Sequence, residues 1–189
     1  MTSNKLLRLL ENHKSTFQAE QHFIQQTSIF IRSHTNFYKR SNLVGHITGS
    51  AWILSPDLQS TLLIHHRKLE LWFQPGGHVD PTDQTIAETA EREAREETGL
   101  GEFDIITDRI FDVDIHEIPE RREVPKHLHY DVRMLCIAKD TSIKPSFKEV
   151  KGIKWLNIKE ALKDQDNYPT VRRMLLKSLN IRDFIAGKH

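Results

Sequence analysis

Residues 74–81 read QPGGHVDP and residues 92–100 read REAREETGL, and these two stretches decide how the chain folds. The first is a double-glycine loop, because paired glycines permit a tight turn and a close approach of the backbone. The second belongs to a segment from about residue 85 to Thr98 that has no glycine or proline, which predicts a helix. Gly99 follows as the usual left-handed closing residue.

Three glutamates of this predicted helix share one side. At about 100° per residue, Glu93, Glu96 and Glu97 fall within roughly a 100° arc of the helix surface. Like charges on one turn repel each other, so a bound divalent cation is a natural reason to keep them together. Mg²⁺ and Mn²⁺ prefer oxygen ligands and usually keep some waters, which leaves room for phosphate oxygens. The spacing therefore indicates a site where a cation and a diphosphate meet.

The same charges have a simpler interpretation. Arginines alternate with glutamates at helical spacing, as in Glu91 with Arg95 and Arg92 with Glu96. Such a run is most often a solvated helix face crossed by ion pairs, and the charges alone favour that interpretation. The double-glycine loop at a set distance before the run, and the ending at residues 98–100, favour the metal site.

Together the two stretches resemble the signature of the Nudix hydrolases, which reads Gly, five residues, Glu, seven residues, then Arg-Glu-apolar-x-Glu-Glu-x-Gly-apolar. Counted from Gly77, five residues lead to Asp83 in place of the glutamate, and eight residues rather than seven separate Asp83 from Arg92. Residues 92–100 match without a gap. Both departures lie in the loop and the first turn of the helix, outside the glutamate cluster. The resemblance extends over most of residues 30–160.

The resemblance implies a fold and a set of roles. The fold is an α/β/α sandwich with a mixed sheet, and the subgroup of the family that this chain resembles also carries a helical N-terminal extension. The cofactor is Mg²⁺ or Mn²⁺. Arg92 orients the glutamates through ion pairs, and the proton acceptor is Glu93 or Glu96 of the helix, or Glu149 from a later loop. The implied metal ligands are the carbonyl of Gly77 and the side chains of Glu93, Glu96 and Glu97.

Composition limits the class of protein. A chain of 189 residues with 38% hydrophobic residues fits one compact domain with a modest extension. A net charge of +1 gives no electrostatic case for nucleic acid as the main partner, and no apolar run approaches membrane-spanning length. Cys136 is the only cysteine, which favours a reducing compartment. We therefore expect a cytoplasmic protein with no nucleic acid or membrane partner, and the resemblance to the Nudix hydrolases implies that its partner is a small-molecule nucleotide or nucleoside diphosphate derivative.

The chain divides into two parts. Residues 1–42 read as a helical extension that packs on the main domain, and residues 43–189 as the Nudix hydrolase domain. A homodimer contact is the alternative role for the extension. Strands interspersed with helices, without a regular alternation, argue for a mixed sheet covered by helices on both sides.

Local signals place the elements. Ser15 with Gln18, and Asn157 with Glu160, have the spacing of capping boxes at helix starts. A final helix is expected after Pro169. Strands are expected at residues 47–54, 61–65, 71–73, 105–116, 127–138 and 153–156.

The predicted strand that begins at His127 has a polar face. His127, His129, Asp131 and Arg133 alternate with apolar residues and so point to the same side. This side is either part of a substrate pocket, with His129 and Asp131 in contact with the substrate, or an exposed sheet face. Histidines one residue apart also suggest zinc, but the sequence contains no second cluster with zinc spacing.

Two further residues are candidates for substrate binding. Lys68 lies in the basic turn before the glycine loop, where its amine could meet a terminal phosphate. Trp72 is a candidate platform on which a base stacks, as is Trp52, although core packing is expected for at least one of them.

These observations lead to one functional hypothesis with two alternatives. We expect a Mg²⁺- or Mn²⁺-dependent pyrophosphohydrolase that cleaves a diphosphate linkage in a nucleoside diphosphate joined to another moiety. One alternative is a ligand-binding regulatory module on the same fold, which needs no intact cation site. The other is a prenyl diphosphate isomerase, which would need a cysteine near the pocket, whereas Cys136 falls on the strand face opposite His129 and Asp131.

Overall fold

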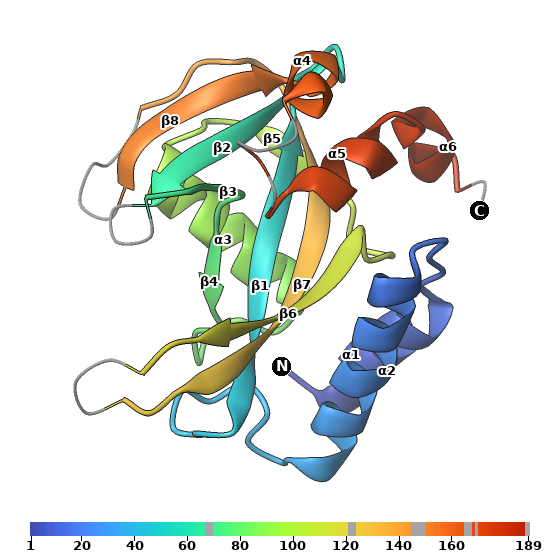
Figure 1. Ribbon diagram of the computed structural model, residues 1–189, viewed down its shortest axis with the longest axis vertical. Helices are drawn as coiled ribbons and strands as arrows, with labels where there is room; N and C mark the ends of the chain where they lie inside the picture. Colours follow the sequence, from blue (N-terminus) through green and yellow to red (C-terminus); the bar gives the residue numbers. More distant parts are fainter. Residues whose placement is uncertain (67–69, 121–123, 145–149, 165–167, 169, 188–189) are drawn as a thin grey trace. The chain divides into compact units, whose positions relative to one another are not determined.

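The structure, a computed structural model, describes residues 1–66, 70–120, 124–144, 150–164, 168 and 170–187 (Figure 1). None of the helices within these ranges is long and apolar enough to span a membrane. The helices are α1 (Ser3–Asn12), α2 (Gln18–Ser33), α3 (Ile86–Thr98), α4 (Ile158–Lys163), α5 (Arg172–Ser178) and α6 (Ile181–Ile185). The strands are β1 (Gly45–Leu54), β2 (Ser60–His66), β3 (Trp72–Phe73), β4 (Gly76–His78), β5 (Phe103–Ile105), β6 (Asp112–Ile118), β7 (His127–Ala138) and β8 (Val150–Asn157).

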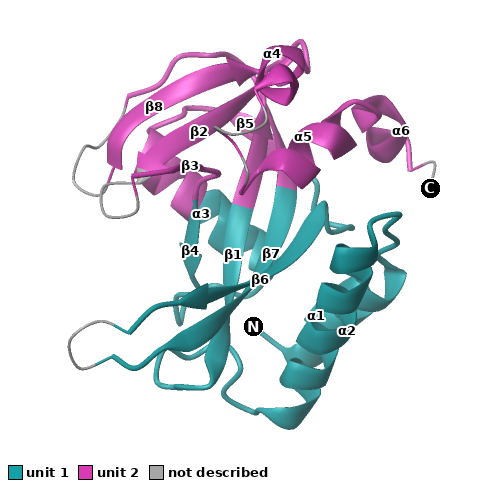
Figure 2. Cartoon of the chain, viewed as in Figure 1, with its two compact units in different colours: residues 1–50, 76–92, 106–134 teal, residues 51–75, 93–105, 135–189 magenta. Residues whose placement is uncertain are grey.

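The strands form a mixed sheet in the order β3-β2-β1-β7-β5, with β4 paired to β1, β6 to β7 and β8 to β2. Sheet and helices make the α/β fold, with N-terminal helices, that the sequence predicts (Figure 1). The chain forms two compact units, coloured separately in Figure 2. Unit 1 comprises residues 1–50, 76–92 and 106–134, and unit 2 comprises residues 51–75, 93–105 and 135–189.

Unit 1 holds the double-glycine stretch against the first half of β1. β4 pairs antiparallel with β1, with Gly77 opposite Gly49 and Gly76 opposite Ser50. A Cβ atom on Gly49 would lie 2.9 Å from the side chain of Thr89, and one on Gly76 would collide with the side chain of Ser50. Glycine at these two positions therefore lets the start of α3 and strand β4 approach β1 closely.

The N-terminal helices also belong to unit 1. α1 packs against α2, and α2 packs against β6. Glu20 is 0% exposed, and its carboxylate accepts the backbone N–H of Val113 in β6 at 3.0 Å and lies 2.8 Å from Nε2 of His13. The ring of Phe30 stacks on Tyr130 of β7 with the centroids 4.1 Å apart. Because a buried carboxylate is costly without partners, Glu20 ties α2 to β6.

Unit 2 contains the ladder between β2 and β8 and the end of α3. Trp52 is 0% exposed and its indole N–H donates to the hydroxyl of Ser178 at 2.9 Å, which makes Trp52 a core residue. Gly99 closes α3 with a φ of +61°, in the left-handed conformation. A Cβ atom there would collide with the backbone carbonyl of Lys144. The predicted helix end at Gly99 is confirmed. The close approach of the Lys144 carbonyl is a second reason why glycine is needed there.

Two predicted elements are each divided in the structure. Residues 105–116 do not form one strand: β5 and β6 are separate and pair with different parts of β7. β7 has 12 residues, so one long strand offers room for both. The helix predicted after Pro169 is likewise two helices, α5 and α6, separated at Leu179 and Asn180.

The two predicted capping boxes have different outcomes. Asn157 caps α4, because its side chain accepts the N–H groups of Lys159 and Glu160. The box at Ser15 is wrong: α2 has Phe17 at its N-cap with no side-chain cap, and the Ser15 hydroxyl donates to Glu20 instead. Glu20 is buried by its contact with Val113 of β6, and its buried carboxylate takes the hydroxyl of Ser15 that the motif would have used as a cap.

Candidate active site

The three glutamates predicted to bind metal lie on one unbroken helix, α3. Glu96 is exposed, and Glu93 and Glu97 are half-buried. A stripe of small and apolar side chains borders the glutamates on α3 and is almost completely buried, namely Ile86, Ala87, Ala90 and Ala94. At about 100° per residue, Glu93 and Glu97 lie at the edge of this stripe and Glu96 lies farthest from it, which agrees with the exposure of Glu96 and the partial burial of the other two.

Arg92 is fastened to the loop before α3. Its guanidinium donates to the carbonyl of His78 at 2.8 Å and to the carboxylate of Asp83 at 3.0 and 3.3 Å. Asp83 is 5% exposed and also accepts the hydroxyl of Thr89 and the backbone N–H of Asp80, both at 2.9 Å. Burial alone would raise the pKa of Asp83, but these hydrogen bonds, above all those from Arg92, hold the pKa below its ordinary value.

Asp83 stands where the Nudix signature has glutamate, and its contacts are structural. Asp83 connects the loop after β4 to α3 through its hydrogen bonds with Arg92, which directly precedes Glu93. The expected role of Arg92 in orienting the glutamates stays a prediction. What the structure adds is that Arg92 itself is held by Asp83 and by the backbone of His78.

The donor set of α3 fits a hard divalent cation, because carboxylate oxygens are the ligands that Mg²⁺ and Mn²⁺ prefer. Gly77, the predicted backbone ligand, is half-buried in β4. In the part of the chain that the structure describes, the side chains that already converge as potential metal ligands are three histidines rather than these glutamates. To bind one ion, Glu93, Glu96 and Glu97 would turn toward a common point, where the positive charge of the ion would offset their mutual repulsion.

Trp72, a predicted substrate contact, lies in unit 2 in a small aromatic and cationic group. Nζ of Lys154 sits 3.9 Å from the centroid of the Trp72 ring and donates to the hydroxyl of Tyr168 at 2.9 Å. The ring of His65 lies 4.9 Å from the Trp72 ring. Trp72 is half-exposed, in contrast to Trp52, so one tryptophan is in the core as expected and the other is partly accessible.

Asp131, another predicted substrate contact, is the centre of a buried polar network in unit 1. One carboxylate oxygen accepts the hydroxyls of Thr48 at 3.0 Å and Ser50 at 2.7 Å. The other oxygen accepts Nε of Arg133 at 2.8 Å. With both oxygens bonded to protein donors, Asp131 has a clear structural role, and its contact with substrate stays a prediction.

Arg133 is shared among three carboxylates. Besides Asp131 it donates to Asp112 and to Asp114, each at 3.0 Å. Burial of Arg133 disfavours its charge, but the three carboxylates raise its pKa above the ordinary value. The polar strand face predicted from His127 onward therefore contains an internal ion network and, at its start, histidines.

His129 lies among other histidine rings, with His46, His78 and His127 at centroid distances of 4.8 to 5.3 Å. The sequence pattern identified His127 and His129 but not His46 and His78, which come from β1 and β4. Two predicted residues, Lys68 and Glu149, lie outside the described residues. Cys136 is a free thiol and 0% exposed.

A double-glycine strand that leads into a helix with clustered carboxylates, on a mixed sheet, defines a class of enzyme, the pyrophosphohydrolases that act on phosphoanhydride bonds. The model of the NUDIX domain matches residues 46–177, and the chain belongs to the Nudix family. A comparison with curated proteins gives no match.

Solved structures of the family share the fold. The binary complex of an Ap4A hydrolase from C. elegans is 21% identical, with a TM-score of 0.51 over 75% of this chain and 98% of that one. The NUDIX domain of Shewanella oneidensis NrtR, complexed with ADP ribose, is 19% identical, with a TM-score of 0.51 over 72% and 86%. A Nudix hydrolase from M. smegmatis, RenU, is 17% identical, with a TM-score of 0.51 over 72% and 88%.

Proposed function

We propose that the protein is a Mg²⁺- or Mn²⁺-dependent hydrolase that cleaves the diphosphate linkage of a nucleoside diphosphate joined to another group. The observation that carries the proposal is α3, on which Glu93, Glu96 and Glu97 share one side of an unbroken helix. The double-glycine strand β4 precedes this helix, and membership in the Nudix family supports the same chemistry.

Different residues of the chain would bind the ion, accept the proton and position the helix. The carbonyl of Gly77 and the carboxylates of Glu93, Glu96 and Glu97 would hold the ion. When bound, the ion neutralises charge on the diphosphate and lowers the pKa of the attacking water. Glu93 or Glu96 takes the proton that the water loses, with Glu149 as the alternative base. Arg92, held by Asp83, positions the helix turn that carries Glu93.

The group joined to the diphosphate would be bound away from α3. Trp72 is half-exposed and would stack on a base, and Lys154 adds a positive charge at 3.9 Å from the ring. Lys68, His129 and Asp131 are the further predicted contacts. Because two structural neighbours are an Ap4A hydrolase and a domain complexed with ADP ribose, both compounds belong in a substrate panel.

The test is a panel of nucleotide sugars, ADP-ribose, dinucleotide polyphosphates, nucleoside triphosphates and coenzyme A, incubated with the full chain and Mg²⁺ or Mn²⁺. Product masses should show cleavage between two phosphates, with loss of turnover in EDTA and recovery when the cation is restored. Binding of a panel compound without any turnover would instead identify a ligand-binding regulatory module.

The isomerase alternative has a separate test. Proton exchange into a prenyl diphosphate, followed by mass spectrometry, would identify that activity and contradict the hydrolase. We expect no exchange, because the thiol of Cys136 is completely buried.

A further inference from the structure

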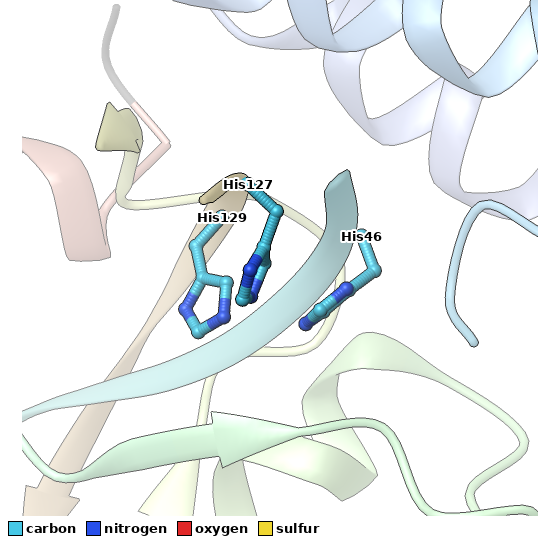
Figure 3. Close-up of side chains that lie close together, drawn as sticks. All are labelled: His46, His127 and His129. Atoms are coloured by element: carbon cyan, nitrogen blue, oxygen red, sulfur yellow. The ribbon is translucent and has the colours of Figure 1, made fainter. Parts of the chain in front are cut away.

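Unit 1 gathers histidines from separate strands. His46 comes from β1, and His127 and His129 come from β7. The ring centroids are 5.0 Å apart for His46 and His127, 4.8 Å for His46 and His129, and 5.3 Å for His127 and His129. Figure 3 shows the side chain of His46 pointing from β1 toward the other two rings. Residues about 80 positions apart in the sequence thus form one group.

The spacing of these rings suits a metal ion. Each of the three histidines offers one nitrogen, and these nitrogens all lie within 4.8 Å of one another. Around a tetrahedral zinc with Zn–N bonds of about 2.0 Å, imidazole centroids lie roughly 5 Å apart and the nitrogens about 3.3 Å apart. The centroid distances match this arrangement, and side-chain rotations would bring the nitrogens from within 4.8 Å of one another to the shorter separation around an ion.

The central ring, His46, is buried and has unsatisfied nitrogens. It is 2% exposed, and neither Nδ1 nor Nε2 makes a hydrogen bond of ordinary geometry among the described residues, although the backbone of Asn42 is close enough to raise the pKa of this ring. A buried polar group without a partner costs about 1–3 kcal/mol, and native proteins rarely keep one without a reason. A bound ion would give one of these nitrogens its partner.

The second ring, His127, is oriented as metal-binding histidines usually are. Its Nδ1 lies 2.9 Å from the carbonyl oxygen of Pro125. A carbonyl only accepts, so Nδ1 carries the hydrogen and the lone pair of Nε2 is available. A backbone carbonyl that fixes the tautomer in this way is the common outer partner of a histidine ligand.

We propose that His46, His127 and His129 bind a zinc ion through their ring nitrogens, with the fourth position open beside His78. The ring of His78 lies 4.9 Å from that of His46 and 5.0 Å from that of His129. Three nitrogen ligands favour a borderline-soft ion such as Zn²⁺ over Mg²⁺, which prefers oxygen. The site is chemically distinct from the carboxylates of α3 and does not depend on the hydrolase proposal.

The first test is calorimetric titration of ZnCl₂ into the full chain, without a purification tag and stripped of metal with EDTA before desalting. One equivalent should bind. His127→Gln and His129→Gln should each weaken binding by about tenfold or more. His22→Gln is the matched control, because His22 is exposed on α2. The zinc affinity of this variant should equal that of the unmodified chain.

A further pair of variants separates this site from the carboxylates. Glu96→Gln and Glu97→Gln should keep the zinc affinity, whatever happens to catalysis. If zinc binding survives His127→Gln and His129→Gln but is lost in Glu96→Gln, the ion occupies α3 and the proposal is overturned. The absence of binding to the unmodified chain would overturn it equally.

A spectroscopic measurement needs no variant and so does not depend on whether one folds. Cobalt(II) added to the unmodified chain should give the intense visible absorption of tetrahedral coordination. X-ray absorption of the zinc-loaded chain should show nitrogen neighbours at about 2.0–2.1 Å with imidazole scattering. A spectrum with oxygen neighbours only would contradict the histidine site.

Discussion

Glu96 lies on α3 and Asp83 lies in the loop just before it, and the two carboxylates differ in their exposure to solvent. Glu96 is exposed on α3, whereas Asp83 is buried and accepts hydrogen bonds from Arg92, Thr89 and the backbone of Asp80. A change at Glu96 therefore alters chemistry with little effect on packing, and a change at Asp83 alters stability. Substitutions at these two positions separate catalysis from folding.

Glu96→Gln and Glu97→Gln should each lower turnover roughly a hundredfold or more, because the change removes a negative ligand and a potential base. The melting temperature should stay within a few degrees of the unmodified chain. Initial rates on the compound found by the panel, with thermal unfolding in parallel, provide the measurement. Glu102→Gln is the matched control, since Glu102 is exposed just after α3, and it should retain full activity. Retained activity in both helix variants would overturn the mechanism.

Asp83→Asn should lower the free energy of unfolding by about 1–3 kcal/mol, because it breaks the buried ion pair with Arg92. Urea unfolding of both chains measures the difference. Asp104→Asn serves as the comparison: its pair with Lys139 is exposed, and such pairs contribute about 0–1 kcal/mol. Equal effects of the two substitutions would show that burial of Asp83 does not matter.

The loss of free energy of unfolding caused by Asp83→Asn should also depend on pH. The pKa of Asp83 is lower in the folded protein than its ordinary value, so its contribution is present above the ordinary carboxyl pKa of about 4 and is lost as the pH falls through the folded pKa. The stability difference between the two chains should be complete at pH 7 and shrink below about pH 4. A difference that grows on acidification would contradict the assignment.

At the scale of elements, the end of α3 depends on Gly99. Gly99→Ala should lower the free energy of unfolding by about 1–3 kcal/mol, because alanine is strained at a φ of +61° and its Cβ would meet the carbonyl of Lys144. Gly101→Ala is a close control, since a Cβ there has no atom within 4 Å among the described residues. Its effect should stay within about 0.5 kcal/mol. Chemical denaturation compares them, and equal losses would refute the argument.

Elements with strong local signals could be predicted from the sequence. The helix over residues 85–98 has good helix formers and a closing glycine, and the cap at Asn157 is made by groups two and three residues away. Where contacts from distant parts of the chain compete, local reasoning fails. Glu20 is buried against β6, where it accepts the N–H of Val113, and it also accepts the hydroxyl of Ser15, which therefore does not cap α2. β7 accepts two partner strands, so one predicted strand divides.

The candidate site shows the same limit. Glu93, Glu96 and Glu97 are close in sequence, so helical periodicity alone brings them to one side. His127 and His129 also share a strand face. His46 joins them only through the arrangement of β1 and β7, and no local pattern indicates that pairing. Likewise, alternation in β7 predicted a polar face, but the partners of Asp131 at Thr48 and Ser50 come from the fold.

At the scale of the whole molecule, the N-terminal helices are part of a compact unit rather than an appendage. A truncated chain of residues 43–189 should have a free energy of unfolding at least about 3 kcal/mol lower than that of the full chain. It lacks the buried side chains of Phe30 and Ile31, each of which contributes roughly 1.5–3 kcal/mol. Calorimetry compares the two chains. Ile29→Ser in the full chain is the control, since Ile29 is 56% exposed. Equal stability of both chains would make the extension an independent element.

The network at Arg133 constrains how this sequence can diverge. Arg133 is the shared ion-pair partner of Asp112, Asp114 and Asp131 within unit 1, so a lineage that lost the arginine first would leave three carboxylates crowded together. A lineage that lost one aspartate first would keep the arginine paired with the other two carboxylates. Substitutions should therefore accumulate in one order, with the acids changing before the base, and the four positions should covary among descendants of this chain.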